Sequence, residues 1–253
     1  MRIPQYWVRE TRELPQGGVM RLHGTSQLSM SDAAHRLEKR AALRLSFAAG
    51  KMGVEELRTA RRFLKKAGYE HAIDDTTFFL LNEHTSVEET AHYLDALDRG
   101  ENVGLLSEAG LPCVADPGKL VTRQAQRRGA EIVPLVGPSS LMLALMASGL
   151  NGQNFAFSGY LPVDKHERSA AIRQLEARAL KEDQTQLFIE APYRNNQMLE
   201  ALSDTLRDET MICVAVDITL DSQQIRTLSA RQWRKERSKI NLHKRNTVFA
   251  IGR

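Results

Sequence analysis

Residues 103–118, VGLLSEAGLPCVADPG, decide the fold of this sequence. The first four residues form a short apolar run, which is typical of a strand buried on both faces. The closely spaced Gly and Pro residues that follow predict a sharply folded loop with accessible backbone. Ligands of open α/β sheets bind at the carboxyl ends of the strands. The stretch therefore predicts a buried strand that ends in a ligand-binding loop, and a tight structural turn is the alternative.

Strand and helix patterns alternate on both sides of this stretch. Ser86 and Glu89 have the spacing of a capping box and predict the start of a helix that ends at Gly100. Further apolar strands are expected at 77–82, 131–136, 155–160, 185–190, 211–218, 224–228 and 247–251. This alternation predicts an α/β fold of two domains, with mainly parallel sheets and a mixed sheet in the second. The junction is expected at Pro134–Pro138, and no strand is expected before Lys51.

The composition excludes several classes of protein. Of 253 residues, 42% are hydrophobic and 26% are charged, which is ordinary for a globular protein rather than a disordered or coiled-coil chain. The longest apolar stretch, Ser140–Leu150, is too short to span a membrane. Two distant cysteines without a Cys/His cluster argue against a metal site. Nothing at the N-terminus resembles a signal peptide, so we expect a cytoplasmic protein.

Positive charge is concentrated near the C-terminus. Residues 226–245 contain eight Lys or Arg and one acid, although the whole chain has a formal net charge of only +4. Such a run indicates an anionic partner, nucleic acid above all, or else a solvated basic face. The candidate RNA-binding residues are Arg226, Arg231, Arg234, Lys235, Arg237 and Lys239.

Three further loops share the strand-end position. Ser139 or Ser140 can cap the helix after Gly137-Pro138, and free N–H groups there can bind a carboxylate or a hydroxyl. The third loop is Gly159-Tyr160-Leu161-Pro162. In the fourth, FIEAPYR at 188–194, a carboxylate, an aromatic ring and an arginine follow a strand.

These four segments, in this order, resemble the tetrapyrrole methylase family of S-adenosylmethionine-dependent methyltransferases. They are most similar to the branch that contains the 16S ribosomal RNA cytidine 2′-O-methyltransferase, in a short form without its C-terminal extension. That branch reads S-D-A-G-x-P-x-x-x-D-P-G, P-G-x-S/A, G-F/Y-L-P and F-x-E-x-P-H/Y-R. This chain has Glu108 in place of the Asp, and Gly137-Pro138 in place of Pro-Gly.

The resemblance implies two α/β domains with the methyl donor, S-adenosylmethionine, bound in the cleft between them, and usually a homodimer. The domains expected are 54–135 and 136–253, preceded by an atypical segment at 1–53. The residues that the motifs place at the donor are Ser107, Glu108, Ala109, Gly110, Pro112, Gly137, Pro138, Ser139, Ser140 and Tyr193.

The leading interpretation is ribose 2′-O-methylation of RNA in the small ribosomal subunit. Two alternatives remain: C-methylation of a tetrapyrrole, and a non-catalytic RNA- or partner-binding remnant. Removal of the hydroxyl proton needs a base, for which Glu190 and Glu108 are candidates, and Arg194 can bind a phosphate. Alternatively, Glu190 and Arg194 simply pair, and Glu108 caps a turn.

The first residues do not match the opening motif of the family. When read in a shifted frame, the codons for Tyr6-Trp7-Val8 encode Leu-Gly, which is close to the expected opening loop. Residues 1–53 are therefore expected to be either a divergent N-terminus or, wholly or partly, a frameshifted translation. In the second case the donor site would be incomplete and activity impaired.

Overall fold

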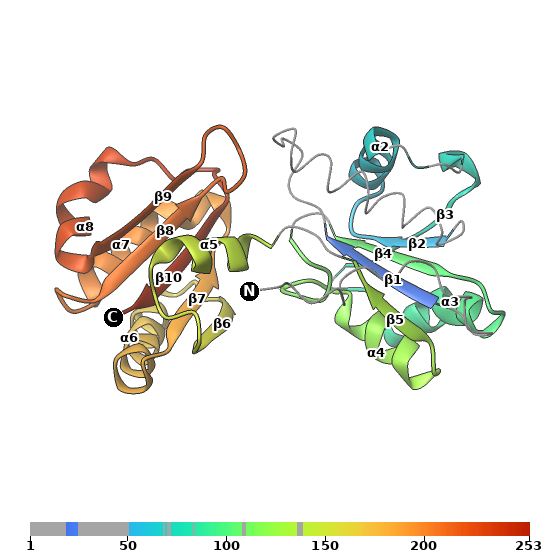
Figure 1. Ribbon diagram of the computed structural model, residues 1–253, viewed down its shortest axis with the longest axis horizontal. Helices are drawn as coiled ribbons and strands as arrows, with labels where there is room; N and C mark the ends of the chain where they lie inside the picture. The colour runs from blue at the N-terminus through green and yellow to red at the C-terminus, as the bar shows by residue number, and fades with distance from the viewer. Residues whose placement is uncertain are drawn as a thin grey trace, which may run out of the picture. The chain divides into compact units, whose positions relative to one another are not determined.

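A computed structural model describes residues 19–24, 51–67, 69, 72–82, 84–107, 110–135 and 139–253. Among these residues the chain forms two compact units, unit 1 up to residue 135 and unit 2 from residue 139 (Figure 1). Each unit is a five-stranded sheet with helices on both faces, so the predicted α/β class is confirmed. None of the described helices is long and apolar enough to cross a membrane.

Unit 1 contains an entirely parallel sheet in the order β3-β2-β4-β1-β5. Its strands are β1 (Val19–Gly24), β2 (Lys51–Val54), β3 (Thr77–Leu80), β4 (Val103–Ser107) and β5 (Glu131–Pro134). Its helices are α2 (Leu57–Ala67), η2 (Ile73–Asp75), α3 (Val87–Asp98) and α4 (Lys119–Arg127).

Alternate residues of β4 face opposite layers of helices. Leu106 packs with Phe63 and Leu64 of α2, whereas Leu105 packs with Leu94 of α3 and Val121 of α4. All five residues of β4 are buried, as the apolar run predicts. Ser86 also caps α3 in a complete capping box with Glu89, which confirms that prediction.

The prediction that no strand precedes residue 51 is wrong. β1 pairs with β4 on one side and β5 on the other, and it therefore fills an inner position of the sheet. The sequence of β1, VMRLHG, contains Arg21 and His23 and does not look like a buried strand. β2 was not expected from the sequence either; Val54 ends this strand, and helix α2 begins at Leu57.

Unit 2 contains a mixed sheet in the order β6-β7-β10-β8-β9. The strands are β6 (Phe155–Tyr160), β7 (Thr185–Ile189), β8 (Met211–Val216), β9 (Gln224–Ser229) and β10 (Thr247–Gly252). β6 and β7 are parallel, and β10 runs antiparallel to both β7 and β8. The mixed sheet and the antiparallel strands at its end are as the spacing predicted.

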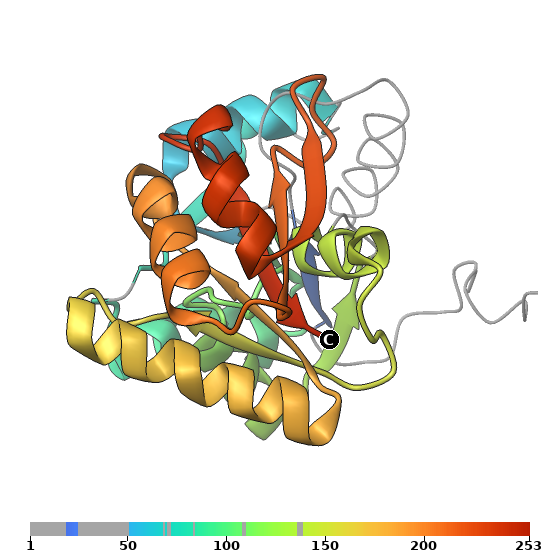
Figure 2. The same cartoon turned by 90° about the vertical axis from the view of Figure 1, so that its left-hand side faces the viewer.

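Helices cover both faces of this sheet. They are α5 (Ser140–Ser148), α6 (Lys165–Glu182), η3 (Pro192–Arg194), α7 (Asn195–Thr205), α8 (Ala230–Glu236) and η4 (Arg237–Lys239). α6, α7 and α8 lie side by side over one face, as Figure 2 shows, and α5 packs on the other. Alternate side chains of β8 point to opposite faces of the sheet. Ile212 and Val214 pack against α6, α7 and α8, while Cys213 packs against α5.

Candidate functional site

The carboxyl ends of the parallel strands meet at one edge of unit 1. Between the ends of β2 and β4 and the first turns of α2 there is a small, shallow hollow that is partly open to solvent. The residues that line it are Val54, Glu55, Glu56, Thr59, Ala60, Phe63, Leu106 and Ser107. This is the position at which open α/β sheets bind ligands. Ser107, one of the predicted donor-binding residues, is therefore at the hollow.

Glu56 directly precedes helix α2 and was not predicted from the sequence to be a site residue. Its carboxylate accepts hydrogen bonds from the backbone N–H groups of Arg58 (2.8 Å) and Thr59 (2.6 Å), and from the Thr59 hydroxyl. The Thr59 hydroxyl and these N–H groups hold the pKa of Glu56 below its ordinary value. The negative charge is thus used to cap the helix, and Glu56 is not free to act as a base at the hollow.

The loop after β4 has an unusual backbone. Gly110 has a φ of +87°, and a Cβ there would meet no heavy atom within 4 Å. Cys113 and Ala115 also have positive φ values, 71° and 55°, which non-glycine residues rarely adopt. Asp116 holds this conformation, because its Oδ1 accepts from the N–H groups of Cys113 (3.2 Å) and Gly118 (2.7 Å). Such strain is found at ligand-binding loops.

The other predicted residues of this loop can be placed only in part. Pro112 is buried, and Gly110 is half-buried. Glu108 and Ala109, like Gly137 and Pro138, lie outside the residues that the structure describes. Burial raises the pKa of the Cys113 thiol, whose Sγ lies 3.2 Å from the Thr122 hydroxyl. Cys113 is therefore a packed thiol rather than an activated one.

In unit 2, Glu190 and Arg194 follow β7 and form an ion pair. Arg194 donates to Glu190 Oε1 from Nε (3.0 Å) and Nη2 (2.5 Å), and the N–H of Ala191 donates to the same oxygen (2.6 Å). Only 1% of the Glu190 side chain is exposed, against 19% for Arg194. Tyr193, by contrast, is exposed, and its ring centroid lies 5.4 Å from the Arg194 guanidinium. The geometry favours the simple pair over a carboxylate that is free to remove a proton.

Sequence reasoning missed Asn195, Asp217 and Arg245, which lie at the same edge of unit 2. Asn195 is fully buried, and its Nδ2 donates to the Arg245 carbonyl (2.6 Å). Asp217 follows β8 as Glu190 follows β7, and its Oδ2 accepts from Arg245 Nε (2.8 Å) and the Ser222 hydroxyl (2.9 Å). An acidic residue directly after a buried strand was the available signal for Asp217. Together these contacts fix the segments that follow β7 and β8 and precede β10.

Ser139 caps α5 as predicted. Its Oγ accepts from the N–H of Met142 at 3.4 Å, a long hydrogen bond, and Ser140 is the exposed first residue of the helix. The first N–H groups of α5 therefore remain the feature that could bind an anion or a hydroxyl in unit 2.

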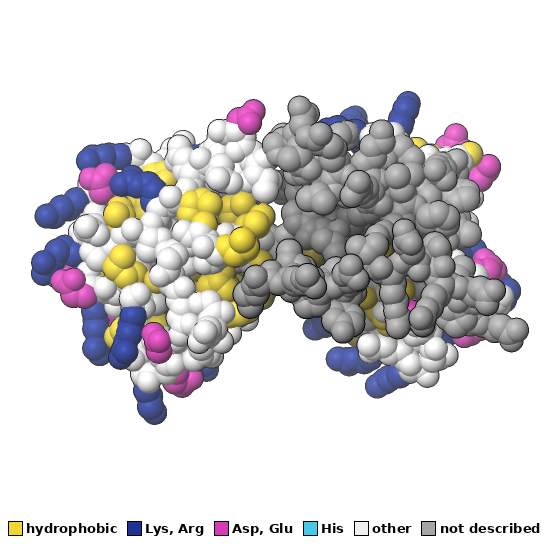
Figure 3. Space-filling model, in the orientation of Figure 1, with side chains coloured by type: hydrophobic (Ala, Val, Ile, Leu, Met, Phe, Trp, Pro, Cys, Tyr) yellow, Lys and Arg dark blue, Asp and Glu magenta, His cyan; other side chains and the backbone are white. Residues whose placement is uncertain are grey.

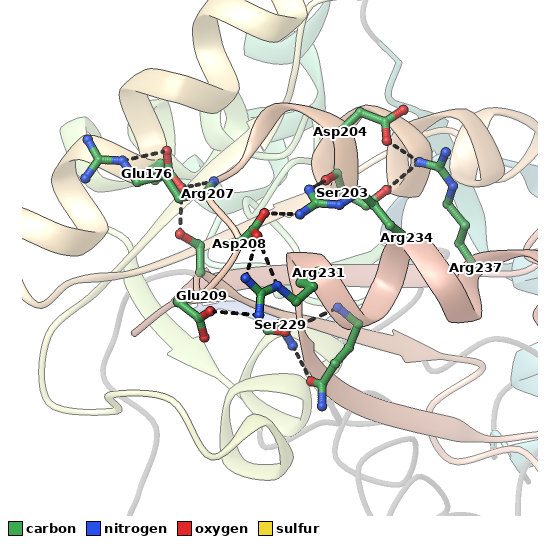
Figure 4. A network of polar contacts seen from close by, with 12 residues as sticks. Glu176, Ser203, Asp204, Arg207, Asp208, Glu209, Ser229, Arg231, Arg234 and Arg237 are labelled. Carbon is green, nitrogen blue, oxygen red and sulfur yellow. Dashed lines mark hydrogen bonds and ion pairs between the residues drawn. The ribbon is translucent and has the colours of Figure 1, made fainter.

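The predicted RNA-binding residues lie on and around α8, where most of them are paired with acids (Figure 4). Arg231 and Arg234 both bind Asp208, and Arg237 binds Asp204 at 2.6 Å. Arg226 and Lys239 both bind Glu236, at 3.5 and 2.7 Å. In Figure 3 the same edge of unit 2 shows Lys and Arg interspersed with Asp and Glu. These ion pairs connect α8 and η4 with Asp204 of α7 and with Asp208 in the segment after it, while Lys235 is exposed and forms no ion pair with a described residue.

Residues 33–232 match the sequence profile of the Tetrapyrrole (Corrin/Porphyrin) Methylases. The chain belongs to this family. Its relatives include proteins named Ribosomal RNA small subunit methyltransferase I. The protein from Pseudomonas aeruginosa is 33% identical over 160 residues, which are 63% of this chain and 55% of the relative. The protein from Mesorhizobium japonicum is 31% identical over 211 residues, which are 83% of this chain and 69% of the relative. In several such relatives the aligned part is only about half of their length.

The fold of solved tetrapyrrole methylases agrees with this assignment. The methyltransferase CobJ superposes with a TM-score of 0.58 at 18% identity, covering 93% of this chain and 94% of CobJ. At this identity the likeness establishes the fold of the family and nothing about the substrate.

Proposed function

We propose that the protein is an S-adenosylmethionine-dependent methyltransferase that acts on a ribose 2′-hydroxyl of small-subunit ribosomal RNA. The observation that carries the proposal is the 31% identity over 83% of the chain to a protein named Ribosomal RNA small subunit methyltransferase I. The motif residues at the carboxyl edges of the two sheets support it. We further propose that the protein acts in the cytoplasm, where ribosomal subunits are, and as a homodimer, an expectation from its family.

The edge of unit 1 fits a methyl donor of this kind. Ser107 is buried at the end of β4, and beyond it Gly110 leaves open space beside a backbone of positive φ. Close approach of a ligand to the backbone is the usual role of such a glycine. With Ser139 and Ser140 at the start of α5, these residues are our proposal for holding the donor. When bound, the donor supplies an electrophilic methyl group on a sulfonium.

The residues of the chain then have to align the hydroxyl and accept its proton. Alignment supplies most of the rate enhancement in a direct displacement of this kind. Of the two candidate bases that the sequence offered, Glu190 and Glu108, Glu190 is paired with Arg194. We therefore propose Glu108, which follows Ser107 in the chain, as the proton acceptor. Arg194 is proposed to position Tyr193 at the donor through the contact between the guanidinium and the ring.

Two measurements test the proposed function. Titration calorimetry with S-adenosylmethionine should show binding, and tritiated methyl groups should be transferred to ribose in small ribosomal subunits. Glu108→Gln should keep donor binding and lose transfer by about 100-fold or more, the usual contribution of a general base. Transfer to a tetrapyrrole instead of RNA would replace the proposed substrate. Absence of donor binding would leave only the non-catalytic interpretation.

A further inference from the structure

Helix α2 presents a continuous basic face in unit 1. Its sequence, LRTARRFLKKA, contains five cations and no acid. These five residues are all exposed: Arg58, Arg61, Arg62, Lys65 and Lys66. Because successive residues of a helix are 100° apart, the five side chains fall within an arc of about 140°. Ala60, Phe63 and Leu64 occupy the opposite side and pack on the sheet.

The cations of this face form no ion pair within the part of the chain that the structure describes, and only Arg58 lies close enough to an acid, Glu56, for its charge to act on it. Among those residues none of the five side chains makes an ion pair or a side-chain hydrogen bond. Arg61 makes a cation–π contact instead, with its guanidinium 5.5 Å from the centroid of the Phe78 ring. Three pairs of like charge stand four residues apart, Arg58 with Arg62, Arg61 with Lys65 and Arg62 with Lys66. Such pairs repel each other and weaken an isolated helix.

The basic residues on and around α8 differ from those of α2 in this respect. Around α8, three acids, Asp204, Asp208 and Glu236, form ion pairs with five of the neighbouring cations. Part of the positive charge of residues 226–245 is thus paired within the fold, whereas no cation of α2 forms an ion pair with a described acid. An uncompensated basic face of this kind is what phosphate groups recognise.

The place of α2 connects this face to the candidate site. Glu56, Thr59, Ala60 and Phe63, from the start of α2, line the hollow at the carboxyl edge of the sheet. α2 lies on one side of the sheet of unit 1 (Figure 1), and dark blue side chains project at the same side in Figure 3. From Arg58 to Lys66 the helix rises about 12 Å, so its side chains can reach several successive phosphates of one strand.

We propose that the exposed basic face of α2 binds the phosphate backbone of the RNA substrate and directs the strand to the hollow at the carboxyl edge of β2 and β4. The proposal rests on the proposed function, since it names the surface by which that substrate is held. Phosphate contacts of this kind give affinity and register but no reading of base sequence. The face would therefore bind RNA of any sequence.

The test compares two fourfold variants by fluorescence anisotropy with a labelled single-stranded RNA of mixed sequence, about 20 nucleotides long. In the α2 variant Arg61, Arg62, Lys65 and Lys66 become Gln, which has a similar helix propensity. In the matched control Lys165, Arg173, Arg178 and Lys181 become Gln. These four are exposed cations of α6 that make no side-chain ion pair with any described residue. Affinity is measured at salt concentrations from about 50 to 200 mM.

The α2 variant should bind RNA at least tenfold more weakly at about 0.1 M salt. Its plot of log affinity against log salt should lose a slope of about 3, from four contacts at about 0.7 each. Its melting temperature should be equal to or higher than that of the wild type, because three repulsive pairs are removed. The control should keep both affinity and slope.

Three results would overturn the proposal: an α2 variant that binds like the wild type, a control that loses as much, or a wild type without affinity for this RNA. Binding to phosphatidylserine vesicles in place of RNA would assign the face to a membrane and overturn it as well. Donor titration and methyl transfer are measured on the same preparations. If the wild type binds RNA through α2 but transfers no methyl group, the proposed function fails by itself.

Discussion

The ion pair of Glu190 and Arg194 predicts an asymmetric response to substitution. Arg194→Met leaves a carboxylate that is 1% exposed with one remaining donor, the N–H of Ala191. At about 4 Å between charge centres and an effective dielectric constant near 20, the lost attraction is about 4 kcal/mol. This agrees with the cost of about 3–5 kcal/mol for removing one partner of a buried pair. We expect unit 2 to lose that much stability.

The double variant Glu190→Met, Arg194→Met should be more stable than Arg194→Met alone. Replacing a buried pair by apolar residues of similar size is often neutral. Only the Ala191 N–H is then left without an acceptor, at a cost of about 1–3 kcal/mol. A second substitution that restores stability distinguishes an uncompensated charge from lost packing.

Urea unfolding followed by Trp233 fluorescence measures these differences in unit 2. Trp233 is fully buried there, and Trp7→Phe makes it the single tryptophan of the chain. Arg173→Met on the surface of α6 serves as the control and should change stability by less than about 0.5 kcal/mol. A loss of under about 1 kcal/mol in Arg194→Met, or a double variant less stable than it, would refute the reasoning.

Three further predictions concern the loops and the α8 network. Gly118→Ala would bring a Cβ to 2.7 Å from Leu105 Cδ2. The substitution should lower the free energy of unfolding by about 1–3 kcal/mol in thermal unfolding and weaken donor binding in calorimetry. Unchanged values would contradict the assigned loop geometry. Gly149→Ala at φ +73°, where a Cβ meets nothing within 4 Å, should cost about 1–2 kcal/mol through backbone conformation alone; no loss in urea unfolding would refute this. Hydrogen bonding to Arg231, aided by the charge of Arg234, holds the pKa of Asp208 below its ordinary 3.8, so its contribution is present above that pH and is lost as the pH falls through the lower folded value. Asp208→Asn should therefore be less stable than the wild type near about pH 6 and approach it near about pH 3 in urea unfolding, and a constant difference would contradict the assignment.

The parts of the fold that followed from the sequence are those where burial alone determines the pattern. β4 and β8 are apolar throughout because helices cover both faces of their sheets. β1 and β2 could not be found in this way. β1 contains Arg21 and His23, and β2 is only four residues long and includes Gly53, so neither pattern indicates a strand. Pairing with neighbouring strands, which is tertiary information, determines both.

For the candidate site, the sequence predicted loops at the ends of strands but not the state of their side chains. The motif after β7 placed a carboxylate and an arginine together, and left open whether Glu190 reacts or pairs. The choice depends on burial and on three hydrogen bonds to one oxygen, which no spacing reveals. Asp217 was missed because its partner, Arg245, is 28 residues away in the chain.

Runs of charged residues in the sequence likewise do not show which charges are paired in the fold. Residues 226–245 hold seven net positive charges, yet Asp204, Asp208 and Glu209, which precede that run, fold back against its arginines. α2 holds five, and no described acid lies within ion-pair distance of them. An anionic partner responds to the charge left after internal pairing, because neutralised groups attract phosphate weakly. Because the five cations of α2 form no ion pair with a described acid and the helix begins beside the hollow, RNA is expected to bind there.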